Sequence, residues 1–581
     1  MASGGSSTTP TKPLSTPVKR AAVNADAGPS RRPQGASPAY SSRRHSLYGI
    51  EDRIVIDPGS RVWKVGFSGE PNPRAVFWAE PAISTQKFSS VKASGPCGQL
   101  FDLDLDDLGV IDRKEANRLI GVRITRNLRS VFSQHLLTDS KSRKVIVLEN
   151  TFLPTLVKEH IAEALFENLK VPSISFTPSA LLALNACGRI TGLVVDCGWL
   201  ETTVTPVFCA RPLYHYARST GLAGRALHRR IKALVQRFAT YYPPPVSRND
   251  LSRPPIHPVP EDLLTDALVE RIVTETLLVG GMAVPKVPSD NVDLDMAEED
   301  AQSKLLDSLR DLHAGSSVAT DLSIPVPQPT ANSFGPGTLV IPGWIRERAA
   351  EVLFECDPDD ESDSIQDCVL NTLLKLPIDL RATLASSILV TGGTAALPGL
   401  MLQLRISLKS ALLPPPGASH LPATPPAPLH TPESRKHEVA EWRRRSHEPY
   451  KDIYGLMDRI ALLNDPAPID GDDGAGHSNA GKAPRWTPSL LSWVGGSLAG
   501  MLKTGSPEMT REEYDTLLGE SIARGEAYRA EQAATEAEVA ALTAIDLESL
   551  QPGEALHSGK RRRGWREGVR LGDWARTVKA A

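Results

Sequence analysis

Two short stretches of the chain repeat one pattern and decide its fold. Residues 54–60 read IVIDPGS, and residues 193–198 read LVVDCG. In each stretch an apolar, β-branched run ends in Asp-x-Gly, which predicts a buried strand followed by a tight turn at the glycine. Either stretch alone would more simply end a strand. Two that face each other can hold a nucleotide, because backbone N–H groups of the turns bind phosphate and the aspartates hold Mg²⁺ through water.

The composition indicates a globular chain with unfolded parts. The chain has 581 residues, of which 41% are hydrophobic and 23% charged, so it is long enough for a large core or several domains. Its 48 prolines cluster, which predicts that part of the chain is unfolded. The net charge of −3 selects no class of partner.

The cysteines and the hydropathy pattern bear on the compartment. The six cysteines are scattered and include no Cys-x-x-Cys pair, which argues against a zinc knuckle and against a disulfide scaffold. A reducing interior is the simpler interpretation. The sequence has no run of roughly 18 apolar residues and no apolar N-terminal segment. We therefore expect a soluble, intracellular protein.

Shifts in composition divide the chain into a central domain and two tails. Residues 1–45 are basic and rich in Ser, Thr, Pro and Ala, and are predicted to be disordered. Residues 46–515 form the predicted domain, with insertions at about 285–335, 414–449 and 464–486. Residues 516–581 are a predicted helical extension and basic tail. Composition does not decide whether a basic tail contacts microtubules, nucleic acid or an acidic protein.

The central domain alternates strands with helices. From residue 53 the predicted order is strand, hairpin, helix, strand, helix, strand and helix, and then the second Asp-x-Gly strand follows. This alternation predicts an α/β sheet with helices on its faces. The first helix is expected to begin near Ile124, and a short apolar helix over 454–463 has no assigned place. Thr510 and Glu513 have capping-box spacing.

Motifs spread along the chain resemble, in order, those of the actin-related proteins. They are Asp57-x-Gly-Ser with Lys64-x-Gly-Phe, Glu149-Asn150 with Pro154, Gly188–Gly192 before the second turn, Leu222–Arg225, Gly392-Gly393-Thr394 with Pro398-Gly399, and Trp493-x-Gly-Gly-Ser with Glu513-Tyr514-Asp515. Each motif is weakly specific, but their order over residues 53–515 is a strong signal. The resemblance implies the α/β actin-like fold shared with Hsp70 and hexokinase, in which two lobes of duplicated domains flank a central nucleotide cleft.

The resemblance also implies a set of cofactor-binding residues. They are Asp57, Gly59, Ser60, Lys64, Asp196, Gly198, Gly392, Gly393 and Thr394, with ATP or ADP as the structural ligand. No catalytic residue and no protein metal ligand is expected. The role of Lys64 as a phosphate-facing side chain is favoured over that of a surface lysine on a hairpin.

The residues after each turn depart from the family pattern. Arg61 replaces the last glycine of the first turn, and Trp199-Leu200 replaces an Asp-Gly pair of the second. Ser179 and Thr203 stand where the family carries the glutamine and histidine that handle the attacking water. Phosphoryl transfer obtains its rate from positioning and charge stabilisation. We therefore expect a protein that is not an enzyme, and a Trp199 that packs in a collapsed loop.

The first lobe departs from the family as well. Residues 78–120 do not resemble the loop with which actins grip the next subunit, so a contact with a filament on one side only is expected. The divergent pointed-end class of dynactin actin-related proteins, numbered ten, or eleven in animals, fits best. This resemblance implies a structural cap on the actin-like filament of dynactin. Its partners would be filament and pointed-end subunits and, indirectly, dynein and cargo adaptors of microtubule transport, in the cytoplasm and cytoskeleton.

Two other functions are kept as alternatives. A nuclear actin-related subunit of a chromatin-remodelling complex also has degenerate loops, and the basic runs near Arg443 and Lys560 could act as nuclear signals. An ATP-hydrolysing actin-like filament protein is the other alternative, and the changed turns count against it. A membrane span is not expected, and nucleic acid is not an expected partner.

Overall fold

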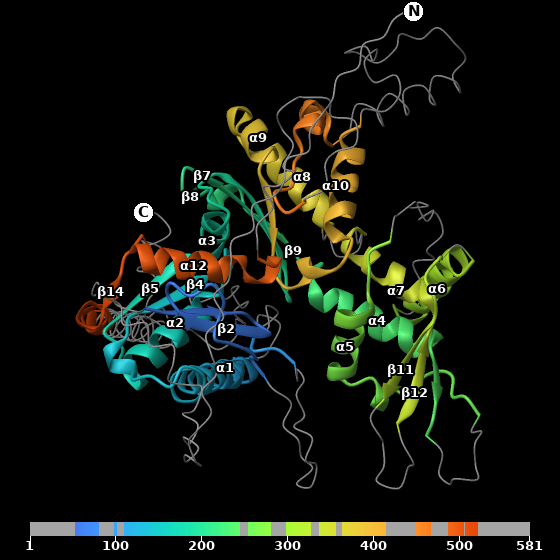
Figure 1. The fold of residues 1–581 in the computed structure, drawn as a ribbon, viewed down its shortest axis with the longest axis horizontal. Coiled ribbons are helices and arrows are strands. Elements are labelled where there is room, and N and C mark those ends of the chain that lie inside the picture. The colour runs from blue at the N-terminus through green and yellow to red at the C-terminus, as the bar shows by residue number, and fades with distance from the viewer. Residues whose placement is uncertain are drawn as a thin grey trace, which may run out of the picture. The chain divides into compact units, whose positions relative to one another are not determined.

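The structure, a computed structural model, describes the central part of the chain (Figure 1). The described residues are 53–80, 98–101, 110–244, 254–280, 298–315, 317–326, 336–355, 363–413, 449–465, 486–504 and 506–520. The predicted N-terminal tail, both basic runs and the chain beyond residue 520 lie outside them. So do residues 414–448 of the predicted insertion at 414–449 and residues 466–485 of the one at 464–486. Among the described residues no helix is long and apolar enough to cross a membrane.

The first Asp-x-Gly stretch forms β1 (Ile54–Pro58), a fully buried strand inside a six-stranded sheet. The strand order is β14-β5-β4-β1-β2-β3. The predicted return strand is β2 (Val62–Phe67), which pairs antiparallel with β1. The edge strand is β3 (Ala75–Trp78), and β4 (Val145–Glu149) runs parallel to β1 and to β5 (Ser173–Pro178). This sheet is the centre of the first lobe.

Two helices pack their apolar faces on the first sheet. They are α1 (Val110–Ser130), followed by a π-helical turn, and α2 (Thr155–Glu163). Ile124 and Leu128 of α1 are fully buried in the core that contains Ile54 and Ile56. The prediction that α1 begins near Ile124 is wrong, because its first half is rich in charged residues and carries little apolar periodicity.

The second Asp-x-Gly stretch forms β6 (Gly192–Cys197) in a second sheet of order β13-β6-β7-β8. Its return strand is β7 (Thr202–Phe208), and β13 (Ile388–Thr391) runs parallel to β6. Two short strands, β8 (Arg211–Pro212) and β9 (Arg218–Thr220), pair with β7. Each half of the domain thus places an Asp-x-Gly turn at the end of a central strand.

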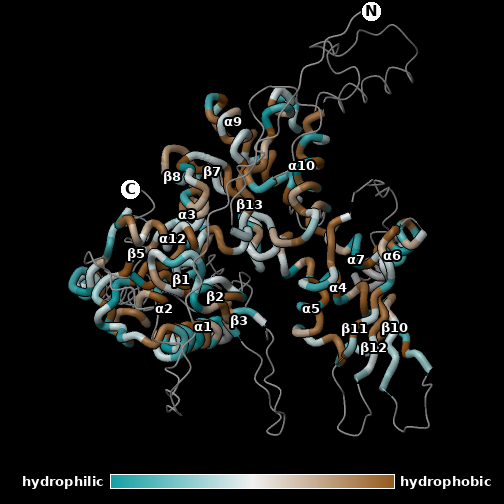
Figure 2. The backbone as a smooth tube through the Cα atoms, viewed as in Figure 1, coloured by the Kyte–Doolittle hydropathy of each residue, from teal (hydrophilic) through white to brown (hydrophobic). Residues whose placement is uncertain are grey.

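A third sheet and seven helices among the described residues complete the second lobe. The sheet has the order β10-β12-β11, formed by Thr240–Tyr242, Gly337–Ile341 and Leu322–Val326. The helices are α4 (Gly224–Phe238), α5 (Asp266–Thr276), α6 (Glu298–His313), α7 (Gly343–Arg348), α8 (Ile365–Lys375), α9 (Ile378–Ala385) and α10 (Leu400–Ala411). Figure 2 shows hydrophobic residues along β13, which is fully buried.

Two sequence predictions about this lobe gain detail. The described part of the predicted insertion at 285–335 holds α6 and β11, which contribute Leu309 and Ile324 to the core. The stretch with no assigned place forms a 3₁₀ helix, Lys451–Arg459, and Leu462 then bridges to Ile388 at the start of β13. The described residues of both stretches therefore belong to the packed second lobe.

Helices α3 (Ser179–Ala186) and α12 (Leu491–Leu502) pack against each other between the two Asp-x-Gly strands. Trp493 of α12 is fully buried, and its indole N–H donates to the carbonyl oxygen of Val55 at 3.2 Å. Gly495 touches the backbone of α3 so closely that an added methyl group would overlap the carbonyl of Leu182. The predicted capping box is confirmed, with Thr510 N–H donating to Glu513 at 2.8 Å and Glu513 N–H to Thr510 at 3.3 Å.

The α3–α12 contact gives a prediction about stability. Gly495→Ala should lower the free energy of unfolding by about 3 kcal/mol, because the methyl group must push apart two buried backbones. Gly455→Ala is the matched control, since an added methyl group there meets no atom within 4 Å. Urea unfolding of the three proteins is the measurement. Equal midpoints for Gly495→Ala and Gly455→Ala would contradict the contact.

Candidate functional site: a cleft between three turns

The nine residues predicted to bind a nucleotide line one cavity of about 470 Å³. They come from the β1–β2 hairpin, from the end of β6 and the turn after it, and from the turn that follows β13. The volume is within the range of small-molecule sites in proteins. The geometry brings these residues together, and their role as nucleotide contacts stays a prediction.

The first turn carries a charge pair. Asp57 lies opposite Lys64 across the β1–β2 ladder, and the two side chains form an ion pair at 2.6 Å. Both side chains are largely buried, so the pair is shielded from water. Lys64 therefore points into the cleft, as expected, but it already has a carboxylate partner.

The second turn carries carboxyl groups with raised pKa values. Burial, and then the neighbouring Asp57, raises the pKa of Asp196 to about 6, while Lys64 opposes the shift. Burial also raises the pKa of Glu201, to about 7. Shifts of this size are common at functional sites, where charged groups are kept at a cost to stability.

The third turn closes on the second at backbone distance. Gly392 has φ +100°, a conformation that favours glycine, and an added methyl group would overlap the carbonyl of Cys197. The hydroxyl of Thr394 donates to the carbonyl oxygen of Gly198 at 2.8 Å. The turns are thus fixed to each other by contacts of the protein itself.

Arg61 reaches from the first lobe across the cleft. Its guanidinium donates to the carboxylate of Glu270 on α5 at 2.8 Å and lies 3.5 Å from the ring centroid of Trp199. Only 5% of the arginine side chain is exposed. Burial lowers the pKa of Arg61 and raises that of Glu270, and each charge partly offsets the shift of the other. Sequence reasoning missed Glu270, because it lies 209 residues from Arg61 and no local pattern links them.

Trp199 and Leu200 reach across the cleft in the opposite direction. Leu200 is 4% exposed and belongs to the hydrophobic core of the first lobe, with Trp199 packed against the same cluster. The indole N–H of Trp199 donates to the side-chain oxygen of Gln99 at 3.0 Å. The ring also meets His228 edge-on at 5.4 Å. Trp199 is therefore a packing residue, as the sequence predicted.

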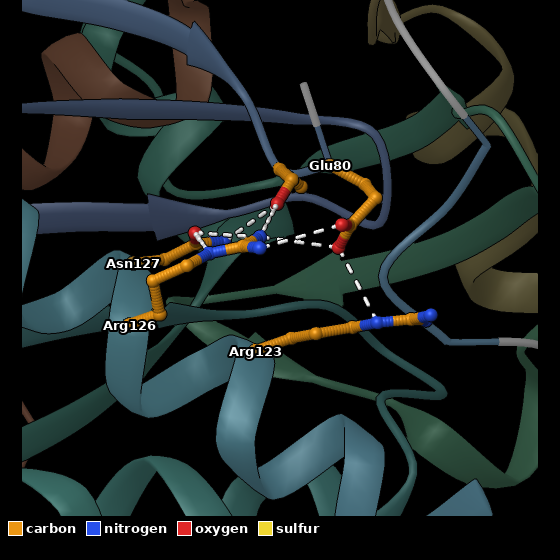
Figure 3. A network of polar contacts seen from close by, with 5 residues as sticks. Glu80, Arg123, Arg126 and Asn127 are labelled. Carbon is orange, nitrogen blue, oxygen red and sulfur yellow. Dashed lines mark hydrogen bonds and ion pairs between the residues drawn. The ribbon is translucent and has the colours of Figure 1, made fainter. Parts of the chain in front are cut away.

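A polar network holds the backbone that carries Arg61 (Figure 3). Glu80 accepts from Arg123 and Arg126 of α1 at 3.3 and 3.1 Å. The Asn127 amide donates to the carbonyl oxygen of Ala79 at 2.8 Å, and the N–H of Ala79 donates in turn to the carbonyl oxygen of Arg61 at 2.8 Å. Helix α1 thereby fixes the position from which the arginine side chain starts.

The raised pKa of Asp196 gives a pH prediction. The folded protein holds this proton more tightly than the unfolded chain, so the free energy of unfolding falls as the pH rises from about 4 to about 6. Asp196→Asn removes the titration. It should raise the free energy of unfolding at pH 7 by about 1 to 3 kcal/mol, and the gain should fade at pH 4. Urea unfolding across this pH range is the measurement.

The control for this prediction is Glu275→Gln, which changes an exposed carboxylate on α5. It should produce no gain that depends on pH. A stability gain of Asp196→Asn that is equal at pH 4 and pH 7, or a loss at pH 7, would contradict the prediction. Either result would show that ionisation of Asp196 does not destabilise the folded protein.

Two comparisons with known proteins agree with this geometry. Residues 51–249, which contain both Asp-x-Gly turns, match the family described as Actin. The chain is also 22% identical over 485 residues to actin-related protein 10 of Dictyostelium discoideum, covering 79% of this chain and 85% of the relative. The comparisons therefore show an actin-family domain over residues 51–249 and a similarity of most of the chain to an actin-related protein.

Proposed function

We propose that this protein is a non-hydrolysing structural subunit that caps the pointed end of the actin-like filament of dynactin and supports dynein-based transport along microtubules. The observation that carries the proposal is the set of changed residues in the two Asp-x-Gly turns. Arg61, Trp199 and Leu200 stand where a hydrolysing relative would carry glycine, aspartate and glycine, and all three side chains are engaged with protein groups. The similarity to actin-related protein 10 over most of both chains supports the choice of class.

The chemistry of the cleft supports a protein without ATPase activity. Ser179 and Thr203, at the two positions that handle water in the family, are buried short side chains. A serine and a threonine in these places cannot reach a water molecule as far as a glutamine or a histidine does, and phosphoryl transfer depends on such positioning. In this proposal ATP or ADP is at most a weakly held structural ligand.

The proposed partners follow from the capping role. One face of the protein contacts the last actin-like subunit of the filament, and the pointed-end subunits of dynactin add to the other side. Dynein and its cargo adaptors are indirect partners. The corresponding location is the cytoplasm and its cytoskeleton.

The partner list tests the capping proposal. A tagged full-length chain, purified from a native extract at low expression, should recover dynactin subunits when its partners are identified by mass spectrometry. The Gly495→Ala variant, whose α3–α12 contact is disrupted, serves as a control and should recover them poorly. Recovery of chromatin-remodelling subunits without dynactin subunits would overturn the proposal and favour the nuclear alternative.

Single-turnover hydrolysis of ATP tests the inactive cleft. Wild-type protein should show no turnover above buffer, because the residues that orient water are missing. Asp196→Ala distinguishes turnover in this cleft from a contaminating ATPase. Turnover in the wild type that disappears in Asp196→Ala would contradict the proposal.

A further inference from the structure

We propose that Arg61, Trp199, Leu200 and Glu270 form a latch that keeps the cleft closed without a nucleotide. The inference rests on the proposed function and deepens it, because it names the protein groups that take over the structural role of the ligand. Arg61 lies in the first Asp-x-Gly turn, Trp199 and Leu200 lie in the second, and Glu270 lies on α5, so the four residues come from both lobes.

The latch is reciprocal. Arg61 starts in the first lobe and pairs with Glu270, whose helix α5 buries Val269 and Ile272 in the core of the second lobe. Leu200 starts in the second lobe and is buried in the core of the first. Opening the cleft must therefore separate an ion pair and also expose apolar surface to water.

The electrostatics favour the closed state. The Arg61 side chain is 5% exposed and that of Glu270 is 20% exposed. If the two side chains separate without moving into water, each charge is left buried and without its partner. An arginine suits this place because its flat, delocalised guanidinium stacks on the Trp199 ring while its edge donates to the carboxylate. His228, beside the cluster, has its pKa lowered to about 4 by burial and by Arg61, so it adds no second positive charge near neutral pH.

The latch also competes with phosphate. A phosphate group at the first turn would meet the Arg61 guanidinium, which lines the same cavity and is already held by Glu270. The same phosphate would approach the Glu270 carboxylate at close range, and like charges at short range repel. A nucleotide consequently has to break the latch before its phosphates can bind, whereas in a glycine-turn relative the turn is open.

Hydrogen–deuterium exchange on the full-length chain tests the latch. The probe is millimolar MgATP, and the readout is the exchange of peptides that cover residues 192–208 and 54–67. In the wild type, exchange of these peptides should be the same with and without MgATP. In Arg61→Gly, which restores the glycine of the family, exchange without nucleotide should be about tenfold faster, and MgATP should slow it again.

Two further variants make the test specific. Glu270→Gln should accelerate exchange more than Arg61→Gly does, because it leaves the more deeply buried charge without its partner. In the double variant the second change should add little, since both act on one pair. Glu275→Gln is the matched control: it lies on the same helix and pairs with Arg271 at the surface, so exchange at the cleft should not change. Peptides over β4 and β5 report whether each variant remains folded.

Two outcomes would overturn the latch. One is a wild-type cleft whose exchange is slowed by MgATP as strongly as that of Arg61→Gly. The other is an Arg61→Gly protein that is folded and exchanges at the wild-type rate. These measurements use the isolated chain, so a failed latch leaves the partner list of the capping proposal intact, and a failed partner list leaves the exchange result intact.

Discussion

The contact between α3 and α12 fixes the geometry on which the cleft depends. Gly495 allows the two helices to touch at the backbone, and Trp493 fastens α12 to β1 through its indole N–H. Helix α3 packs against β6 in turn. The two Asp-x-Gly strands are thus both packed against one helix pair, which links the positions of their turns.

Within that frame the turns bind to one another. Gly392 packs against the backbone of the second turn, and Thr394 donates a hydrogen bond to it. The Arg61 guanidinium lies over the Trp199 ring, which joins the first turn to the second. In a nucleotide-dependent relative, the ligand would supply the charge and the contacts that join the lobes. In this protein the latch provides that charge and those contacts through the side chains of Arg61, Glu270, Trp199 and Leu200. The proposed latch thus predicts a cleft that keeps one conformation with or without a nucleotide.

The sequence predicted the parts of this structure that local patterns encode. Apolar runs ending in Asp-x-Gly identified β1 and β6, and the order of the motifs identified the fold. The substitution at Trp199 was enough to predict a packed loop, because an indole does not fit a slim phosphate turn. What could not be predicted is the ion pair of Arg61 with Glu270, since α5 is placed by tertiary packing and its sequence carries no sign of the partner. The sequence also did not predict that α1 begins at Val110, because the charged residues in its first half interrupt the apolar periodicity of the helix.

The retained charges at the centre of the cleft fit this interpretation. Asp57 and Lys64 form a shielded ion pair across the β1–β2 hairpin, so each charge has a partner within the protein. Asp196 is different, because its raised pKa means that the folded state pays for an ionised carboxyl at neutral pH. A fold that tolerates this cost must recover it elsewhere. The buried Leu200 and the stacked Arg61, which lie beside the same turns, contribute burial that a glycine-rich turn lacks.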